Sequence, residues 1–203
     1  MKKVMLSAVL VLGCSIDPAN EPKLVNSGLD NSLLTYQSYK EILDDTITLW
    51  ENINKDKNIA EAYQTLLRLE KSGDEFFSQG HYGKAWNHYS MANRYYPSPK
   101  VLIKGGDAYI YNVLNRFNKI HKTQNIIDDE LYTTIEVNYL RYKIRRYYNL
   151  ALDFNEYLKK NNPLSQILTT AEVKTTLKKV SCLNQKLNFE GSSIDTSILR
   201  SCL

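Results

Sequence analysis

Hydrophobic residues recur every three or four positions over residues 33–187, which is the spacing of one face of an α-helix. The first stripe runs through Tyr36, Leu43 and Trp50, with charged residues between them. No alternation of polar and apolar residues competes with this pattern before Leu187. The pattern therefore predicts an all-α fold.

Capping and proline signals divide this region into helices. Asn58 is followed three residues later by Glu61, and Thr169 by Glu172, and each pair is typical of a capping box at a helix start. Segment 97–99 has a proline at each end, and proline ends a helix but fits the first turn of the next one. We therefore expect helix starts at all three places.

Residues 66–99 carry a regular series of small, aromatic and turn positions. These positions are Leu69, Gly73, Phe76, Gly80, Tyr82, Ala85, Tyr89, Ala92 and Pro97. The series resembles a tetratricopeptide repeat, a helix hairpin of about 34 residues. The resemblance places Gly73 where the second helix packs closely, and Gly80 at a turn that needs a positive φ.

Two further units match the same pattern less well. Residues 100–131 place Gly106 at the small position but lack the turn glycine, so we expect the helix there to be extended. Residues 132–165 match at several positions and depart at others. A third repeat and one long helix over about 130–160 are equally consistent with these residues.

The resemblance implies a short stack of antiparallel hairpins, a tetratricopeptide-like α-solenoid. Such hairpins cannot bury their apolar faces alone, so about three are needed, with atypical units at the ends. Helices 33–54 and 58–79 are candidates for the leading hairpin, and 169–187 for an atypical capping helix. Residues 188–203 then form a C-terminal tail.

The first residues have the layout of a secretory signal, with Lys2 and Lys3 before an apolar run from Val4 to Leu12. The junction Val11-Leu12-Gly13-Cys14 resembles the lipobox of bacterial lipoproteins. That resemblance implies removal of residues 1–13, acylation of Cys14 and a flexible tether over 14–32. It implies a lipid-anchored protein of the cell envelope, with the outer membrane favoured. The alternative is an ordinary cleaved signal with a chance cysteine.

Cleavage changes the charge balance, because both lysines of the signal are lost. The chain carries 26 basic and 22 acidic residues, so 24 and 22 remain, a net charge of +2. Residues 15–75 hold 12 acids and 6 bases, whereas 76–203 hold 10 acids and 18 bases. The first segment is thus negative and the second positive, and this difference in charge favours head-to-tail self-association. The expected location outside the cytoplasm argues against nucleic acid as a partner.

The densest basic cluster comprises Arg141, Lys143, Arg145 and Arg146. We consider it either a solvated helix face or a docking surface for an acidic partner or anionic headgroups.

In tetratricopeptide proteins the first helices line a groove that often binds a peptide or a helix. By that resemblance Glu70, Asp74, Phe77, Asp107 and Tyr111 face the groove, unless they are simply solvated. The predicted function is a scaffold or adaptor for another envelope protein. The alternative is a carrier or transporter accessory that holds a small ligand in a cavity lined by some of the 15 tyrosines.

Residues suited to catalysis or metal binding do not group in the sequence. The three histidines have no partners at metal-ligand spacing, and no phosphate-binding loop is present. We therefore predict no enzymatic activity, no metal and no cofactor. Cys182 and Cys202 form an even pair, which in an oxidising compartment predicts a disulfide, the alternative being two free thiols.

Overall fold

The computed structural model describes residues 31–56, 58–123, 140–161, 167–187 and 199–203, and these residues contain helices and turns but no strand. The all-α prediction is confirmed for this part of the chain. The signal segment, Cys14 and most of the tether lie outside the described residues. The helices are α1 (Asn31–Lys55), α2 (Ile59–Ser78), α3 (Tyr82–Tyr95), α4 (Pro99–Thr123), the π-helical segment η1 (Arg145–Asn149), α6 (Leu150–Asn161) and α7 (Thr170–Leu187).

Helices α2 and α3 form an antiparallel hairpin around Gly80. The φ angle of Gly80 is 75°, as expected for a turn glycine. The backbone N–H of His81 donates to the carbonyl of Phe76 at 2.9 Å, and that of Gly80 to Phe77 at 3.0 Å. These two bonds satisfy carbonyls at the end of α2, so the chain reverses without an orphaned acceptor.

Of the two predicted capping boxes, one forms. The backbone N–H of Thr169 donates to Glu172 at 2.6 Å, and that of Glu172 donates to the Thr169 hydroxyl at 3.2 Å. Asn58 makes no side-chain cap at the start of α2, so the capping box expected there is wrong. The backbone carbonyl of Asn58 accepts from the N–H of Glu61 instead, at 3.0 Å.

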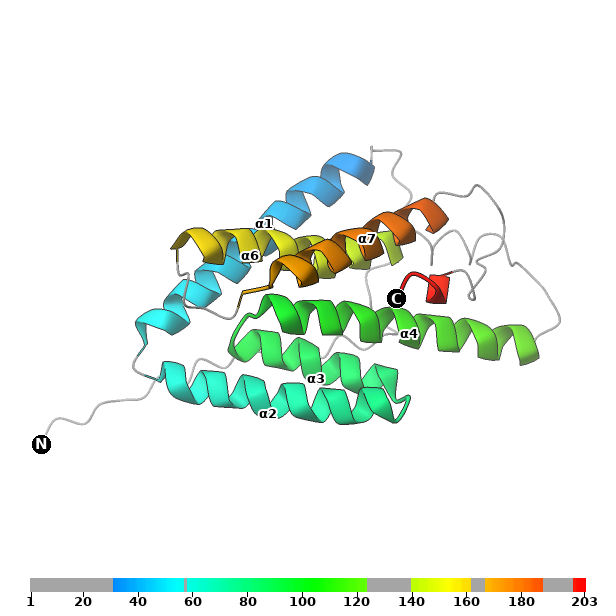
Figure 1. Ribbon diagram of the computed structural model, residues 1–203, viewed down its shortest axis with the longest axis horizontal. Helices are drawn as coiled ribbons and strands as arrows, with labels where there is room; N and C mark the ends of the chain where they lie inside the picture. Colours follow the sequence, from blue (N-terminus) through cyan, green and yellow to red (C-terminus); the bar gives the residue numbers. More distant parts are fainter. Residues whose placement is uncertain (1–30, 57, 124–139, 162–166, 188–198) are drawn as a thin grey trace, which may run out of the picture. The chain divides into compact units, whose positions relative to one another are not determined.

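Figure 1 shows how the helices are arranged, and two hydrophobic clusters hold them together. The smaller cluster joins α2, α3 and α4 around Leu66, Tyr89 and Ala108. The larger one joins α1, α4, residues 140–161, α7 and the C-terminal residues. Helix α1 packs through this second cluster, where Trp50 meets the ring of Phe154 edge-on at 6.4 Å. The buried stripe of α1 is therefore covered by α6, not by a leading hairpin with α2.

The next packed pair of helical segments, α4 with residues 140–161, differs in its details from the α2–α3 hairpin. Helix α4 continues without a turn to Thr123, as the missing glycine led us to expect. Residues 140–161 form one helical run that passes through η1. Over these residues the arrangement is that of the long-helix interpretation, and the remainder of unit 132–165 lies mainly outside the described residues.

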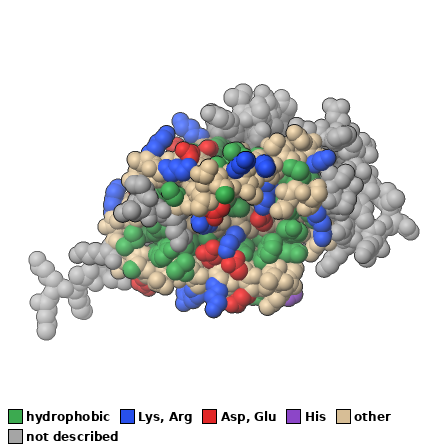
Figure 2. Space-filling view, viewed as in Figure 1, with side chains coloured by type: hydrophobic (Ala, Val, Ile, Leu, Met, Phe, Trp, Pro, Cys, Tyr) green, Lys and Arg blue, Asp and Glu red, His purple; other side chains and the backbone are tan. Residues whose placement is uncertain are grey.

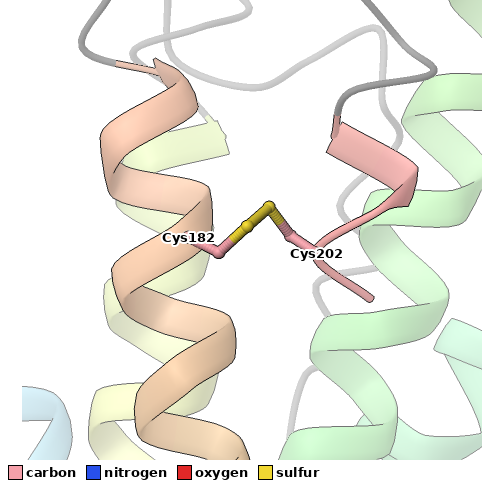
Figure 3. The surroundings of a disulfide bond; sticks show 2 residues. All are labelled: Cys182 and Cys202. Atoms are coloured by element: carbon pink, nitrogen blue, oxygen red, sulfur yellow. A yellow bond between two sulfur atoms is a disulfide. The ribbon is translucent and has the colours of Figure 1, made fainter.

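A disulfide joins α7 to the end of the chain (Figure 3). The sulfur atoms of Cys182 and Cys202 are bonded, and their Cα atoms lie 5.6 Å apart. Leu199 and Cys202 are buried in the larger cluster. The C-terminal residues 199–203 are therefore part of the packed domain, and the tail expected from residue 188 includes an anchored end.

Candidate partner-binding face

The two acidic residues expected on the groove side of α2 share one lysine of α4. The Nζ atom of Lys104 lies 2.8 Å from Glu70 and 2.7 Å from Asp74. The Tyr89 hydroxyl of α3 also donates to Asp74, at 2.7 Å. Both carboxylates are thus held by neighbouring helices, and α2, α3 and α4 are tied together by one polar group of residues.

The acidic residue expected on α4 is held in the same way by the helices that follow. Nζ of Lys179, on α7, lies 2.7 Å from Asp107, and the Tyr148 hydroxyl donates to that carboxylate at 2.5 Å. The Lys179 side chain is only 10% exposed. A buried ammonium needs such a partner, because isolating it from water is costly.

Each of these aspartates follows a glycine that is covered by a tyrosine ring. A Cβ atom placed on Gly73 would lie 2.5 Å from the ring of Tyr89, and one on Gly106 would lie 3.0 Å from the ring of Tyr148 and 2.9 Å from Cβ of Tyr147. Both glycines therefore allow a close approach that any larger residue would block. The same contacts thus occur twice. In each case a tyrosine ring covers a glycine, and the tyrosine hydroxyl and a lysine both bind the aspartate that follows this glycine.

These ion pairs shift the ionisation of the residues that form them. Burial lowers the pKa of Lys104, but the hydrogen bonds to Asp74 and Glu70 outweigh it and raise that pKa above its ordinary value. Burial, then the hydrogen bond to Asp74, raises the pKa of Tyr89. Burial and the charge of Asp107 raise the pKa of Tyr148 well above the usual range. Both tyrosines stay protonated at neutral pH and act as donors.

Phe77 and Tyr111, the remaining residues predicted in the groove, lie together in an aromatic cluster with Tyr82. The rings of Tyr82 and Tyr111 stack with centroids 5.0 Å apart. Phe77 meets Tyr82 edge-on at 5.1 Å and Tyr111 at 5.5 Å. All three side chains are half-buried. The cluster therefore presents part of its aromatic surface to solvent, next to the acidic residues of α2.

The expected groove residues and the lysines that pair with them come from α2, α4 and α7. On the face drawn in Figure 2, acidic and basic side chains lie close together in the middle, and hydrophobic side chains gather on either side of them. The pairing means that this surface is polar without being strongly charged. We call the surface of Glu70, Asp74, Phe77, Tyr111 and Asp107 the groove face.

The basic cluster is not the surface patch that the sequence indicated. Lys143 is 6% exposed, and its ammonium lies 5.6 Å from the ring of Trp86 and 5.2 Å from that of Tyr109. The electron-rich faces of these rings stabilise the charge inside the molecule. Arg141 is half-buried and donates to the backbone carbonyl of Leu187. These two residues therefore serve packing, which corrects the expectation of a solvated or docking face.

Of the other two members of the cluster, only Arg146 has a described side chain. Arg146 is half-buried, with Nη1 3.5 Å from the Tyr142 hydroxyl. The side chain of Arg145 lies outside the described residues.

A shallow pocket of about 270 Å³ lies beside the aromatic cluster. Its walls are residues 80–84, which form the turn between α2 and α3 and the start of α3, together with Asn112, Asn115 and Arg116 of α4. Tyr82 belongs both to this wall and to the aromatic cluster. We call it the α3 pocket.

Four tyrosines of the core serve as packing residues. Tyr89, Tyr109, Tyr147 and Tyr148 are all buried in the two hydrophobic clusters, where their rings fill space. The Tyr147 hydroxyl accepts from the indole Nε1 of Trp86 at 2.5 Å. Their abundance is thus explained by packing with a polar end that finds a partner.

The described residues include neither a candidate membrane-spanning helix nor a cluster of metal ligands. None of their helices is both long enough and apolar enough to cross a membrane. Nor do three or more of their His, Cys, Asp or Glu side chains come together as metal ligands.

Lys104, Lys179 and Tyr148 were not identified from the sequence, although they complete the groove face. One signal was available: the dipeptide Gly-Asp occurs at 73–74 and again at 106–107, 33 residues later. That interval is close to one tetratricopeptide unit. The lysines carry no such signal, since α4 and α7 supply them from positions that differ relative to these dipeptides.

No family model, curated protein or solved structure matches this chain.

Proposed function

We propose that this protein is a lipid-anchored, non-catalytic scaffold of the bacterial cell envelope. It binds a peptide or helix of another envelope protein on the groove face. The observation that carries the proposal is the repeated arrangement of Gly73, Tyr89 and Asp74 in one hairpin and Gly106, Tyr148 and Asp107 in the next. Repetition of one packing device at an interval of 33 residues supports a short tetratricopeptide-like stack.

The composition of the groove face supports a protein partner. Half-exposed aromatic side chains such as Phe77 and Tyr111 are typical of the residues that contribute most to binding energy. Because Lys104 and Lys179 offset two of the three carboxylate charges, the groove face keeps a single net negative charge, and net charge contributes little to the choice of partner there. Apolar contact and hydrogen bonding to the partner backbone then account for recognition.

Partner recovery tests the scaffold role. The protein is cross-linked in intact cells, solubilised with detergent and isolated, and its co-purifying proteins are quantified. We expect a stoichiometric partner, which can be a second copy of this chain, and a loss of most of it in the Phe77→Ala/Tyr111→Ala double variant. The matched control is Tyr95→Ala on α3, which removes an exposed aromatic ring outside the groove face. Recovery of no stoichiometric partner would overturn the proposal.

The anchor is tested separately, because Cys14 lies outside the described residues. The proposal rests here on the lipobox-like junction Val11-Leu12-Gly13-Cys14. We expect Cys14→Ala to abolish fatty-acid labelling and to release the protein from membranes. Ser15→Ala, which keeps the thiol, is the matched control. Unchanged labelling and membrane association in Cys14→Ala would exclude lipid anchoring at this residue.

A further inference from the structure

The α3 pocket has a one-sided charge. Two basic side chains, Lys84 of α3 and Arg116 of α4, contribute to its wall, together with the carboxamides of Asn112 and Asn115. None of the described residues that line it is an aspartate or a glutamate. The pocket thus combines carboxamides with basic residues from two helices, and this composition suits an anionic group.

These cations differ from the lysines of the groove face. Lys104 and Lys179 are each held by carboxylates, whereas Lys84 and Arg116 form no ion pair with the described residues. Both side chains are exposed. Nζ of Lys84 lies over the ring of Phe76, 5.4 Å from its centroid, so no described carboxylate neutralises the charge of Lys84 or of Arg116.

A third cation lies next to the pocket. Nη2 of Arg200, in the C-terminal segment held by the disulfide, donates to Asn115 Oδ1 at 2.8 Å. On the opposite wall the backbone of Gly83 comes close to Asn112, since a Cβ atom there would lie 3.2 Å from Asn112 Oδ1. The Asn115 carboxamide is thus held by a hydrogen bond, and the Asn112 carboxamide occupies the space beside Gly83. The first turn of α3 contains no acidic residue, so the positive end of this helix adds to the same potential.

Tyr82 connects the pocket to the aromatic cluster. It lines the pocket, and its ring stacks on Tyr111. A ligand that places an anionic group in the pocket would have its neighbouring group against the rings of Phe77 and Tyr111. The chemistry that fits both parts is a carboxylate side chain beside an aromatic or aliphatic one.

We propose that the α3 pocket binds an Asp or Glu side chain of the partner segment, next to an aromatic or aliphatic residue that contacts Tyr82 and Tyr111. This inference deepens the proposed function and rests on it. It assigns the preference for an acidic residue of the partner to Lys84 and Arg116, which do not belong to the groove face. One planar guanidinium and one ammonium are well suited to a carboxylate.

Selection from a random peptide library tests the preference. The full-length protein, solubilised in detergent, is used to select peptides from a displayed library, and the enriched sequences are compared with those selected by variants. We expect enrichment of Asp or Glu beside an aromatic or aliphatic residue. For one enriched peptide made synthetically, we expect Lys84→Gln and Arg116→Gln each to weaken binding about tenfold. Arg94→Gln, which removes an exposed arginine elsewhere on α3, is the matched control and leaves affinity unchanged.

The outcomes separate this inference from the scaffold proposal. Enriched peptides without acidic residues, whose binding is lost in Tyr111→Ala but kept in Arg116→Gln, would overturn the pocket assignment and leave the scaffold role intact. No enrichment of any peptide would contradict both. Vesicles of anionic phospholipid and inorganic phosphate are tested in parallel. Binding to either one that depends on Arg116, without acidic peptides, would identify a phosphate group as the ligand and overturn the inference.

Discussion

The Tyr148 hydroxyl donates a 2.5 Å hydrogen bond to Asp107 while its ring covers Gly106, the residue just before that aspartate. Tyr89 stands in the same relationship to Asp74 and Gly73 one hairpin earlier. One side chain thus fills the space above a glycine and anchors a carboxylate. This relationship links the close packing of the hairpins to the charge of the groove face.

Replacing Gly73 by alanine tests the close approach. In an exposed helix this change stabilises by about 1 kcal/mol, because alanine is the better helix former. At Gly73 the new Cβ would lie 2.5 Å from the Tyr89 ring, so we expect a loss of about 1 to 3 kcal/mol instead. Urea denaturation followed by circular dichroism measures the difference. Lys71→Ala, at an exposed position of the same helix, serves as the control, and a stabilised Gly73→Ala protein would contradict the packing account.

Removing the tyrosine hydroxyls tests their role as donors. Tyr148 is fully buried and Asp107 is partly buried, so Tyr148→Phe should cost about 1 to 2 kcal/mol of folding stability. Tyr89→Phe should cost less, because the side chain of Asp74 is 50% exposed and water can replace the lost bond. Chemical denaturation of both variants gives the comparison. Equal losses would show that burial of the carboxylate does not set the cost.

The disulfide between Cys182 and Cys202 should stabilise the domain by about 3 kcal/mol, because it restricts the unfolded chain over a separation of 20 residues. We expect the Cys182→Ser/Cys202→Ser variant to melt at a lower temperature than the oxidised protein. Reductant should lower the melting temperature of the unsubstituted protein to a similar value and leave the variant unaffected. A melting temperature of the unsubstituted protein that does not respond to full reduction would contradict a stabilising bridge.

The capping box of α7 should give the protein part of its acid sensitivity. The backbone N–H of Thr169, followed by its hydroxyl and Lys100, lowers the pKa of Glu172, although partial burial opposes this shift. A pKa lower in the folded than in the unfolded state means that the carboxylate stabilises at neutral pH. That contribution is lost as the pH falls from the ordinary pKa of about 4.3 through the folded value.

Glu172→Gln keeps a hydrogen-bond acceptor and removes the charge. We therefore expect the stability of this variant to fall less steeply below about pH 5 than that of the unsubstituted protein. Glu61→Gln is the control, because Asn58 makes no side-chain cap and Glu61 completes no capping box there. Parallel pH profiles for Glu172→Gln and the unsubstituted protein would exclude a contribution from the capping box.

Local signals in the sequence determined the helices and several of their ends. The periodic apolar residues predicted an all-α chain, Gly80 predicted a turn with positive φ, and Thr169 with Glu172 predicted the start of α7. The paired cysteines predicted the disulfide, with free thiols as the alternative. The helices, the turn and the capping box depend on residues close in sequence, and the disulfide depends on a cysteine pair with few alternatives. The sequence pattern alone was therefore sufficient to predict them.

The tertiary structure decided which residues neutralise which charges. The sequence places Lys143 in a basic patch, but in the structure its ammonium lies over the rings of Trp86 and Tyr109. Neither of these two residues is close to Lys143 in the sequence. Asp74 and Asp107 read as free acids of a groove, yet α4 and α7 bring Lys104 and Lys179 to them. Such pairings arise when helices far apart in the chain pack together. The physical reason is that helix periodicity specifies the buried face of a helix, whereas the neighbour that covers this face depends on the whole packed arrangement.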